Sequence, residues 1–236
     1  MRILSVLALT LVLAGCRSEA PPLVIQTAEV DAGVVSIPAL LDEPARWSGQ
    51  LVTLIAPLAG GPQGRVLVPF LPADETNSST PDPGRAVWLA EPLPAPVAAQ
   101  VGEGPIVLKL RGRLSPPGAY GTEGSFPYQF SAQSASLLLP ERTTLPNLAA
   151  NPHSLDSVVL EIEGSLLADA EGAILADEAA PGGIPTSAAR QIKLRRTWDD
   201  AALEELQQRG DVRYGPVVVV GWWQAGLMTP FMIRPR

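Results

Sequence analysis

Cysteine and histidine are almost missing from this chain: among its 236 residues there is one of each, Cys16 and His153. A single cysteine excludes an intramolecular disulfide, so the fold must be held by its hydrophobic core. Structural zinc sites and Ser-His or Cys-His mechanisms need partners that one histidine, within Asn151-Pro152-His153-Ser154, does not supply. The sequence therefore predicts a protein that is not an enzyme and that has no metal or other cofactor.

Carboxylates offer the remaining route to catalysis or metal binding, but their patterns are not specific. One segment has oxygen ligands without the spacing and central glycine of a calcium loop, and we interpret it as a solvated insertion: Asp74, Glu75, Asn77 and Asp82. Glu161 with Glu163, or Asp199 with Asp200, could be named as the paired carboxylates of a glycosidase. Alternate strand residues and acids at a helix start are ordinary solvent-facing positions, so we interpret both pairs as surface groups.

Basic residues are also outnumbered, with 17 Lys and Arg against 24 Asp and Glu, a formal net charge of -7 and a pI near 4.8. This balance favours solubility and argues against a protein that holds polyanions over its whole surface. Nucleic acid is therefore not an expected partner.

Long hydrophobic runs are scarce, and the one at the start of the chain, Ile3 to Ala14 after Met1-Arg2, is short. A membrane-spanning helix needs about 20 apolar residues, whereas a signal-peptide core needs about 7 to 15. The following Leu13-Ala14-Gly15-Cys16 resembles the bacterial lipobox, in which two small residues precede a cysteine that accepts diacylglycerol. The resemblance implies a signal peptide over 1–15, cleavage before Cys16 and lipidation of the Cys16 thiol.

The same resemblance implies a location in the cell envelope, on the extracytoplasmic side of a membrane that is the protein's first partner. Acyl chains such as palmitate on Cys16 would form the anchor, because two or three chains hold a protein stably. Residues 16–33 show little periodicity, and we interpret them as a lipid-proximal tether. Arg17 stands where an Asp would resemble an inner-membrane retention signal, which favours the outer membrane in a host with two membranes. An ordinary secretory signal that ends in Cys and an uncleaved anchor are the alternatives.

The remaining chain has 25 Pro and 21 Gly and short β-branched segments, a pattern typical of many short strands joined by turns. Over a first domain, 34–140, Ser36 and Pro38 predict a short helix over 36–42 that ends before Pro44. Strands are predicted over 51–58, 65–70, 86–91, 105–114 and 128–139, with a short helix over 94–101. After a linker, 141–154, a second domain, 155–236, has predicted strands over 157–168, 172–178, 190–196, 216–224 and 231–234 and a helix over 199–208.

Both halves thus have three strands, a short helix and two strands, which suggests an internal duplication. Local matches support it, since Gly104-Pro105 corresponds to Gly215-Pro216 and Pro127-Tyr128 to Pro230-Phe231. This order resembles that of the OB-fold, a five-stranded Greek-key barrel. The start of the first half also resembles secreted and lipoprotein OB modules through a pattern of Pro, aromatic, Gly and β-branched residues: Pro44, Trp47, Gly49 and Val52. The predicted fold is mainly β, with two tandem OB-like barrels; a single β-sandwich is the alternative.

On an OB-fold, ligands usually lie across strands two and three, between the loops that join strands one to two and four to five. In the first half this placement predicts a ligand-binding surface that combines aromatic residues with arginine, a combination suited to stacking on bases or sugars: Trp88, Arg113, Tyr120 and Tyr128, near Arg65, Arg85 and Phe126. We expect Tyr120 and Arg113 to face solvent while Phe130 packs inside. Trp88, Tyr128 and Phe130 could alternatively all belong to the barrel core.

The second half contains a basic stripe, Arg190, Lys193, Arg195 and Arg196, that could be a binding surface or a solvated sheet edge. Trp222 and Trp223 must point to opposite sides of their strand. One of them should be exposed unless the other barrel or a partner covers it.

These observations predict a non-enzymatic, membrane-anchored binding or scaffold lipoprotein that holds an envelope protein or glycan. The alternative is a nucleic-acid or glycan binder that uses the OB face of the first domain.

Overall fold

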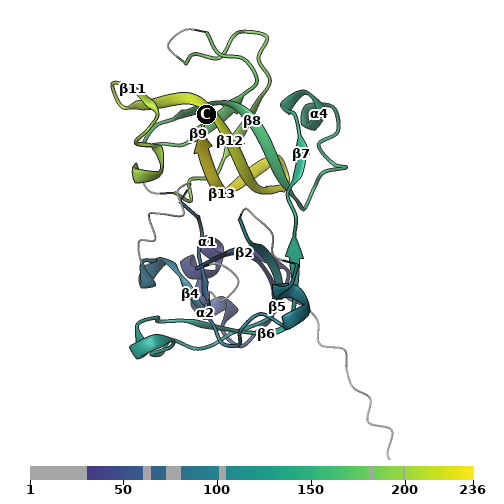
Figure 1. Cartoon of the computed structure of the whole chain (residues 1–236), viewed down its shortest axis with the longest axis vertical. Helices are drawn as coiled ribbons and strands as arrows, with labels where there is room; N and C mark the ends of the chain where they lie inside the picture. The colour runs from purple at the N-terminus through teal and green to yellow at the C-terminus, as the bar shows by residue number, and fades with distance from the viewer. Residues whose placement is uncertain (1–30, 61–64, 73–80, 101–104, 181–182, 199) are drawn as a thin grey trace, which may run out of the picture.

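A computed structural model describes residues 31–60, 65–72, 81–100, 105–180, 183–198 and 200–236. The described chain forms two closed five-stranded barrels of mixed β-sheet that lie one above the other in Figure 1. The prediction of a mainly β fold with two OB-like barrels and short helices is confirmed, and the alternative of a single β-sandwich is wrong. The expected signal peptide, Cys16 and most of the tether lie outside the described residues.

The first barrel has the strand order β2-β3-β4-β6-β5, and β5 pairs back with β2 to close it. Its strands are β2(Leu51–Ala59), β3(Val66–Leu67), β4(Val87–Leu89), β5(Val107–Leu114) and β6(Gln129–Leu138). Only β4 and β6 pair in parallel within the barrel. The helix α3(Ala95–Ala98) and the 3-10 turns η2(Pro83–Arg85) and η3(Thr122–Gly124) lie in the connections.

The second barrel repeats this arrangement, with the order β12-β13-β10-β9-β8 and closure between β8 and β12. Its strands are β8(Val158–Ala168), β9(Ala173–Ala176), β10(Gln191–Leu194), β12(Val212–Gln224) and β13(Leu227–Pro235). The third and fifth barrel strands, β10 and β13, are again the parallel pair. The two halves of the chain thus close their five strands into barrels of the same topology, as the repeated order of predicted elements suggested.

Each barrel is also preceded by a short strand that pairs in parallel with its first barrel strand. In the first half this is β1(Val34–Ser36) on β2, followed by α1(Ile37–Asp42) and α2(Pro44–Trp47). In the second half it is β7(Glu141–Thr143) on β8, followed by α4(Leu145–Ala150). The duplicated pattern therefore begins before the first barrel strand of each half.

Residues 141–154, interpreted from the sequence as a linker, thus contain β7 and α4. The physical reason is a helix start that sequence reasoning overlooked: Thr144 Oγ1 accepts a hydrogen bond from the Asn147 backbone N–H at 3.3 Å. Leu145 and Leu148 are each 1% exposed and belong to the second-barrel core. Between the last strand of the first barrel and β7 only Leu139 and Pro140 remain.

A glycine at the same place in each barrel supports the correspondence. The pairing of the fourth strand with the fifth shifts register between Arg111 and Gly112 in the first barrel and between Val220 and Gly221 in the second. A Cβ on Gly112 would collide with the Ser131 carbonyl, and one on Gly221 would lie 2.7 Å from the Thr229 carbonyl. Both bulges therefore depend on the close backbone approach that only glycine allows.

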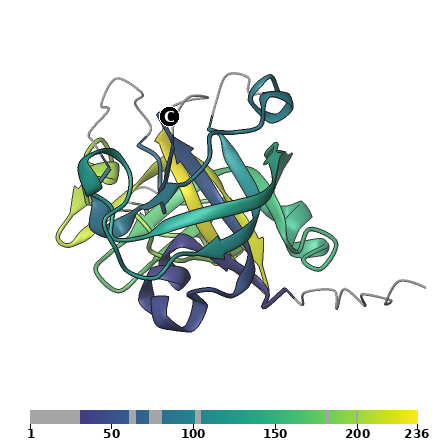
Figure 2. The same ribbon diagram turned by 90° about the horizontal axis from the view of Figure 1, so that it is seen from below.

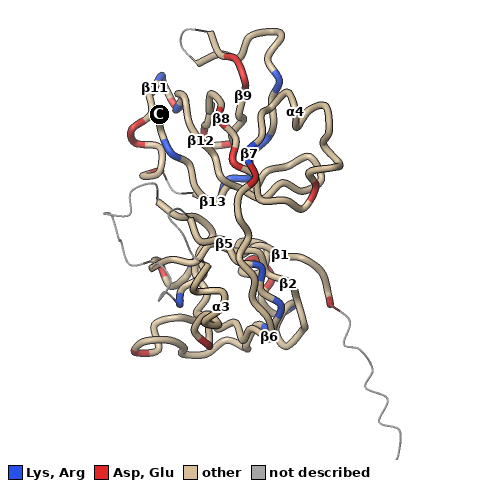
Figure 3. The backbone as a smooth tube through the Cα atoms, turned by 45° about the vertical axis from the view of Figure 1, so that its right-hand side comes forward, with Lys and Arg blue, Asp and Glu red and all other residues tan. Residues whose placement is uncertain are grey.

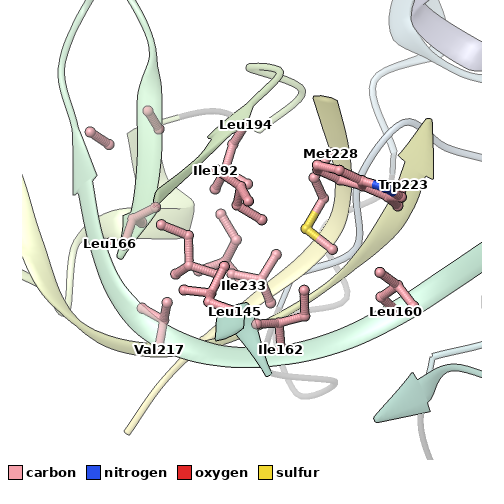
Figure 4. Close-up of a cluster of buried hydrophobic side chains, with 14 of the residues drawn as sticks. Leu145, Leu160, Ile162, Leu166, Ile192, Leu194, Val217, Trp223, Met228 and Ile233 are labelled. Atoms are coloured by element: carbon pink, nitrogen blue, oxygen red, sulfur yellow. The ribbon is translucent and has the colours of Figure 1, made fainter. Parts of the chain in front are cut away.

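Each barrel encloses its own hydrophobic core. Phe130 is fully buried in the first core, so its predicted inward orientation is confirmed. In the second, the side chains labelled in Figure 4 come from α4, β8, β10, β12 and β13 and point into the barrel interior, and β9 adds Leu175 to the same core. The labelled ones are Leu145, Leu160, Ile162, Leu166, Ile192, Leu194, Val217, Trp223, Met228 and Ile233.

A third apolar cluster joins the outer faces of the two barrels. The first barrel contributes Ile55 and Val107, and the second contributes Trp222 and Phe231, which are at most 4% exposed. Figure 2 looks along the long axis, with the first barrel in front of the second. Burial of these side chains makes the two barrels one packed body, because separation would expose all of them to water.

Trp222 and Trp223 lie on opposite sides of β12, as the strand period predicts. Trp223 is in the second-barrel core, and its Nε1–H donates to the Pro152 carbonyl at 3.0 Å. Trp222 is in the cluster between the barrels, where the first barrel covers it. The expectation that one tryptophan needs a cover is therefore confirmed.

The helix predicted over 199–208 is wrong in extent. Among the described residues of this segment, the helical structure is a 3-10 turn, η4(Asp200–Leu203), and β11(Gln207–Arg209) then pairs with the start of β12. This hairpin satisfies backbone groups that a helix would otherwise have paired, and Leu203 and Leu206 are still buried. Among the described residues, no helix has the length and apolar character needed to cross a membrane.

The chain enters the first barrel through a polar contact at Asp31. Its carboxylate accepts hydrogen bonds from the Thr53 hydroxyl at 2.6 Å and the Gly33 backbone N–H at 2.9 Å, and Arg111 Nε lies 3.5 Å away. The hydrogen bond from Thr53, followed by those from Gly33 and Arg111, holds the Asp31 pKa below its ordinary value. The end of the predicted tether is thereby fixed to β2.

Candidate functional site

The predicted surface of the first barrel is centred on Trp88 in β4, whose side chain is partly buried outside the barrel core. The Trp88 ring lies 5.4 Å from the Phe126 ring, and the Arg65 guanidinium lies 4.9 Å from its centroid. Arg65 is held in place because its Nε–H donates to the Leu89 carbonyl at 3.0 Å. An aromatic ring under an arginine is the chemistry that the sequence predicted for this face.

The connection between β5 and β6, however, folds back over this face. Tyr120 and Phe126 exchange backbone hydrogen bonds of 2.9 and 3.1 Å, and Phe126 is buried against Val68 and Ala86. The Tyr120 hydroxyl donates to the Pro116 carbonyl at 2.8 Å within the same connection. Tyr120 is therefore half-buried, in contrast to its expected solvent-facing position, and the protein's own loop occupies much of the predicted binding surface.

The other two predicted residues lie at different places. Tyr128 packs against the first-barrel core, and its backbone carbonyl accepts a hydrogen bond from the Trp88 backbone N–H at 3.0 Å. Arg113 lies on β5 opposite Leu51, and its guanidinium donates to the Gly49 carbonyl. The structure brings Trp88, Tyr120 and the Tyr128 backbone together, and places Arg113 beside the start of β2. Ligand binding by these residues stays a prediction.

A second candidate site lies open on the second barrel, between the β8–β9 turn and the segment that joins β10 to β12. It is a cleft of about 300 Å³. Its lining residues are Ala168, Asp169, Ala170, Arg196, Trp198, Asp200, Leu203, Gln208, Asp211 and Arg213. Clefts that hold small ligands have volumes of about 300 to 1,000 Å³, and this one lies at the lower end of that range.

Two arginines fix the walls of the cleft. Arg196 donates to the carbonyls of Asp169 and Ala170 at 3.3 and 3.2 Å, and its Nη2 lies 2.5 Å from Asp200 Oδ1. Arg213 Nη1 donates to the carbonyls of Leu203 and Glu204 at 3.2 and 3.1 Å. Each guanidinium therefore ties one loop to the barrel and at the same time faces the cleft.

Residues of the first barrel contact the part of the second barrel that carries Trp198, one of the residues that line this cleft. Phe70, in the connection after β3, packs against the second-barrel core with its ring centroid 6.4 Å from that of Trp198. Beside it the Leu71 N–H donates to the Phe231 carbonyl at 2.7 Å, and Arg85 donates to the Thr197 carbonyl at 3.3 Å. Trp198 is 4% exposed, so it is held between the two barrels while its remaining edge lines the cleft.

The basic stripe of the second half is not a solvated sheet edge, because β10 pairs with β9 on one side and β13 on the other. Arg190 forms an ion pair with Asp177, Lys193 and Arg195 are exposed, and Arg196 joins the cleft. Figure 3 shows basic and acidic residues on both barrels. Of the four residues in the stripe, only Arg196 lines the cleft.

Of the predicted carboxylate groups, Glu161 and Glu163 pair with Arg142 and Arg236, while Asp82 accepts from the Gly84 N–H. Asp74, Glu75, Asn77 and Asp199 lie outside the described residues. In the part of the chain that the structure describes, no group of three or more His, Cys, Asp or Glu residues could hold a metal ion.

Sequence reasoning missed Gln208, Asp211 and Arg213, which line the cleft. They lie around Gly210, at the end of the segment for which the sequence predicts a helix over 199–208, whereas the chain forms a β-hairpin there. A hairpin interpretation of Gly210-Asp211 would have placed Gln208 and Arg213 opposite each other.

Comparisons of the chain with protein-family models, with characterised proteins and with solved structures gave no match.

Proposed function

We propose that this chain is a non-enzymatic lipoprotein of the cell envelope, anchored by lipid on Cys16, that binds a small ligand or an exposed group of an envelope component in the cleft of its second barrel. The observation that carries the binding function is the cleft of about 300 Å³ whose walls are fixed by Arg196 and Arg213. The lipobox-like segment before Cys16 supports the anchor.

The packing of the two barrels supports a binding role for this particular site. Ligand sites are usually largely preformed, because ordering loops on binding costs affinity. Here Phe70 from the first barrel braces Trp198, and both arginines are hydrogen-bonded to backbone carbonyls. The cleft is thus preorganised, with polar groups already held in place.

The alternative, a nucleic-acid or glycan binder that uses the OB face of the first barrel, would require the connection after β5 to leave Trp88. Phe126 is buried there at 6% exposure, and the net charge of -7 opposes a polyanion. The second barrel is therefore the better-supported site.

The anchor is tested by metabolic labelling with a fatty acid and by membrane fractionation. Wild-type protein should carry the label and partition with membranes, whereas Cys16→Ser should lose the label and either become soluble or accumulate as the precursor. A Cys16→Ser protein that is labelled and partitions like the wild type would rule out this anchor.

The binding function is tested by placing a photo-crosslinking amino acid at Gln208 or at Gln207 in the native envelope. Gln208 lines the cleft, and Gln207 is its exposed neighbour on β11 with its side chain outside the lining. A discrete adduct from position 208 that is absent from position 207 is the expected result. Equal adducts from both positions, or none from either, would contradict binding in this cleft.

A further inference from the structure

We propose that the second-barrel cleft recognises a neutral saccharide of one or two rings; this inference rests on the proposed binding function and specifies its ligand. The charge balance of the lining is the first reason. Two arginines and three aspartates line the cleft. Arg196 is already neutralised by Asp200 at 2.5 Å, so no strong positive field remains for an anion.

The mixture of hydrogen-bonding groups is the second reason. Asp211 makes no hydrogen bond or ion pair with the residues that the structure describes, so its carboxylate is available as an acceptor. Gln208 donates one Nε2–H to the Gly210 carbonyl at 2.9 Å, which leaves its second N–H as a donor and its Oε1 as an acceptor. Arg213 uses Nη1 on carbonyls while its other N–H groups are donors. A sugar hydroxyl donates and accepts at once, so neighbouring hydroxyls match such alternating partners.

The apolar part of the lining is the third reason. Ala168, Trp198 and Leu203 contribute to the same cleft. A saccharide ring carries C–H groups on its faces as well as hydroxyls at its rim, and it therefore needs both kinds of surface. The volume of about 300 Å³ is at the lower end of the range for ligand sites, which limits the ligand to one or two rings.

The test is titration calorimetry of the full lipidated chain in detergent with maltose, cellobiose and di-N-acetylchitobiose, compared with digalacturonate and inorganic phosphate. We expect at least one neutral disaccharide to bind and the two anions not to bind. Gln208→Ala should weaken that binding by about five- to tenfold, the loss expected for one or two neutral hydrogen bonds. Gln207→Ala, the matched neighbour, should change it by less than about twofold.

Asp211→Asn gives a second measurement, since it removes a charged acceptor from an exposed turn and keeps the shape of the side chain. It should also weaken the neutral saccharide. Binding of digalacturonate or phosphate alone, no binding of any neutral saccharide, or binding that is insensitive to Gln208→Ala and Asp211→Asn would overturn the proposal. If crosslinking from position 208 still gives a specific adduct in those cases, the cleft binds another class of ligand and the proposed binding function stands.

Discussion

Trp222 and Trp223 are adjacent and equally buried, each 4% exposed, but their indole N–H groups have different surroundings. Trp223 Nε1–H donates to the Pro152 carbonyl at 3.0 Å. Trp222 Nε1 is buried in the cluster between the barrels and has no hydrogen-bond partner among the described residues. Replacing each tryptophan by phenylalanine therefore separates the contribution of the ring from that of the N–H group.

Both substitutions replace an indole by a smaller phenyl ring, and the buried apolar surface that is lost costs each variant about 1 kcal/mol of stability. At Trp222 the change also removes a buried donor whose unpaired state costs about 1 to 3 kcal/mol, so the two effects nearly cancel. At Trp223 the change breaks a hydrogen bond worth about 0.5 to 1.5 kcal/mol and leaves the Pro152 carbonyl unpaired. Trp223→Phe should therefore destabilise the protein by about 2 kcal/mol more than Trp222→Phe.

The assay is urea unfolding followed by far-ultraviolet circular dichroism, because tryptophan fluorescence would change with the substitutions themselves. With a urea dependence of about 2 kcal/mol per molar, the two midpoints should differ by about 1 M. Trp222→Ala provides the control for packing: the loss of about 3 to 5 kcal/mol expected for truncating a buried tryptophan is only partly offset by removal of the unpaired N–H, so this variant should be clearly destabilised. Equal midpoints for the two phenylalanine variants would refute the assignment of an unpaired N–H to Trp222.

Asp31→Asn should lower the melting temperature at pH 7 but much less at about pH 2. Folding lowers the pKa of the Asp31 carboxyl from its ordinary value of 3.8, so the carboxylate stabilises the fold at pH values above 3.8. This stabilisation is lost as the pH falls through the folded-state pKa. Thermal melts at both pH values check this, and an equal difference at both would contradict it. Gly121→Ala should destabilise more than Gly226→Ala, because both have positive φ (+73° and +82°) but only at Gly121 would the Cβ lie 2.8 Å from the Trp88 ring. Equal losses of melting temperature would show that the loop does not rest on that ring. Chain halves divided after residue 138 should aggregate when expressed alone and associate when co-expressed, since each exposes its side of the apolar cluster; soluble monomeric halves, seen by size-exclusion chromatography, would argue against the shared cluster.

The barrel strands could be predicted because alternation and β-branched residues reflect burial on one face. The segment 107–114 shows this, with Leu108, Leu110 and Leu114 inside. The duplication was visible for the same reason, as one order of short strands and turns repeated. Some observed strands extend beyond their predicted limits because neighbouring strands pair with them there. An example is β12, which is predicted from residue 216 but begins at Val212 and includes Pro216.

The junction and the cleft could not be predicted, because their contacts join residues far apart in sequence. Phe70 reaches Trp198 across the barrels, and nothing near either residue indicates the other. The covered face of Trp88 was missed for a related reason: the long connection after β5 looked like an exposed binding loop. Gly121 and Phe126 instead make it a packed cover, which local composition does not reveal.

Only Leu139 and Pro140 separate β6 from β7, and the two barrels share a buried cluster. Both features restrict a hinge motion of one barrel relative to the other. If lipid on Cys16 anchors the protein as proposed, the distance between the cleft and the membrane is limited by the number of residues before Asp31. Those 15 residues, 16–30, span at most about 50 Å when fully extended. Under the proposed anchor, a tether of that length would confine the cleft near the surface at an effective concentration of millimolar order. Even weak, millimolar affinity for a group displayed on that membrane would then keep the cleft substantially occupied.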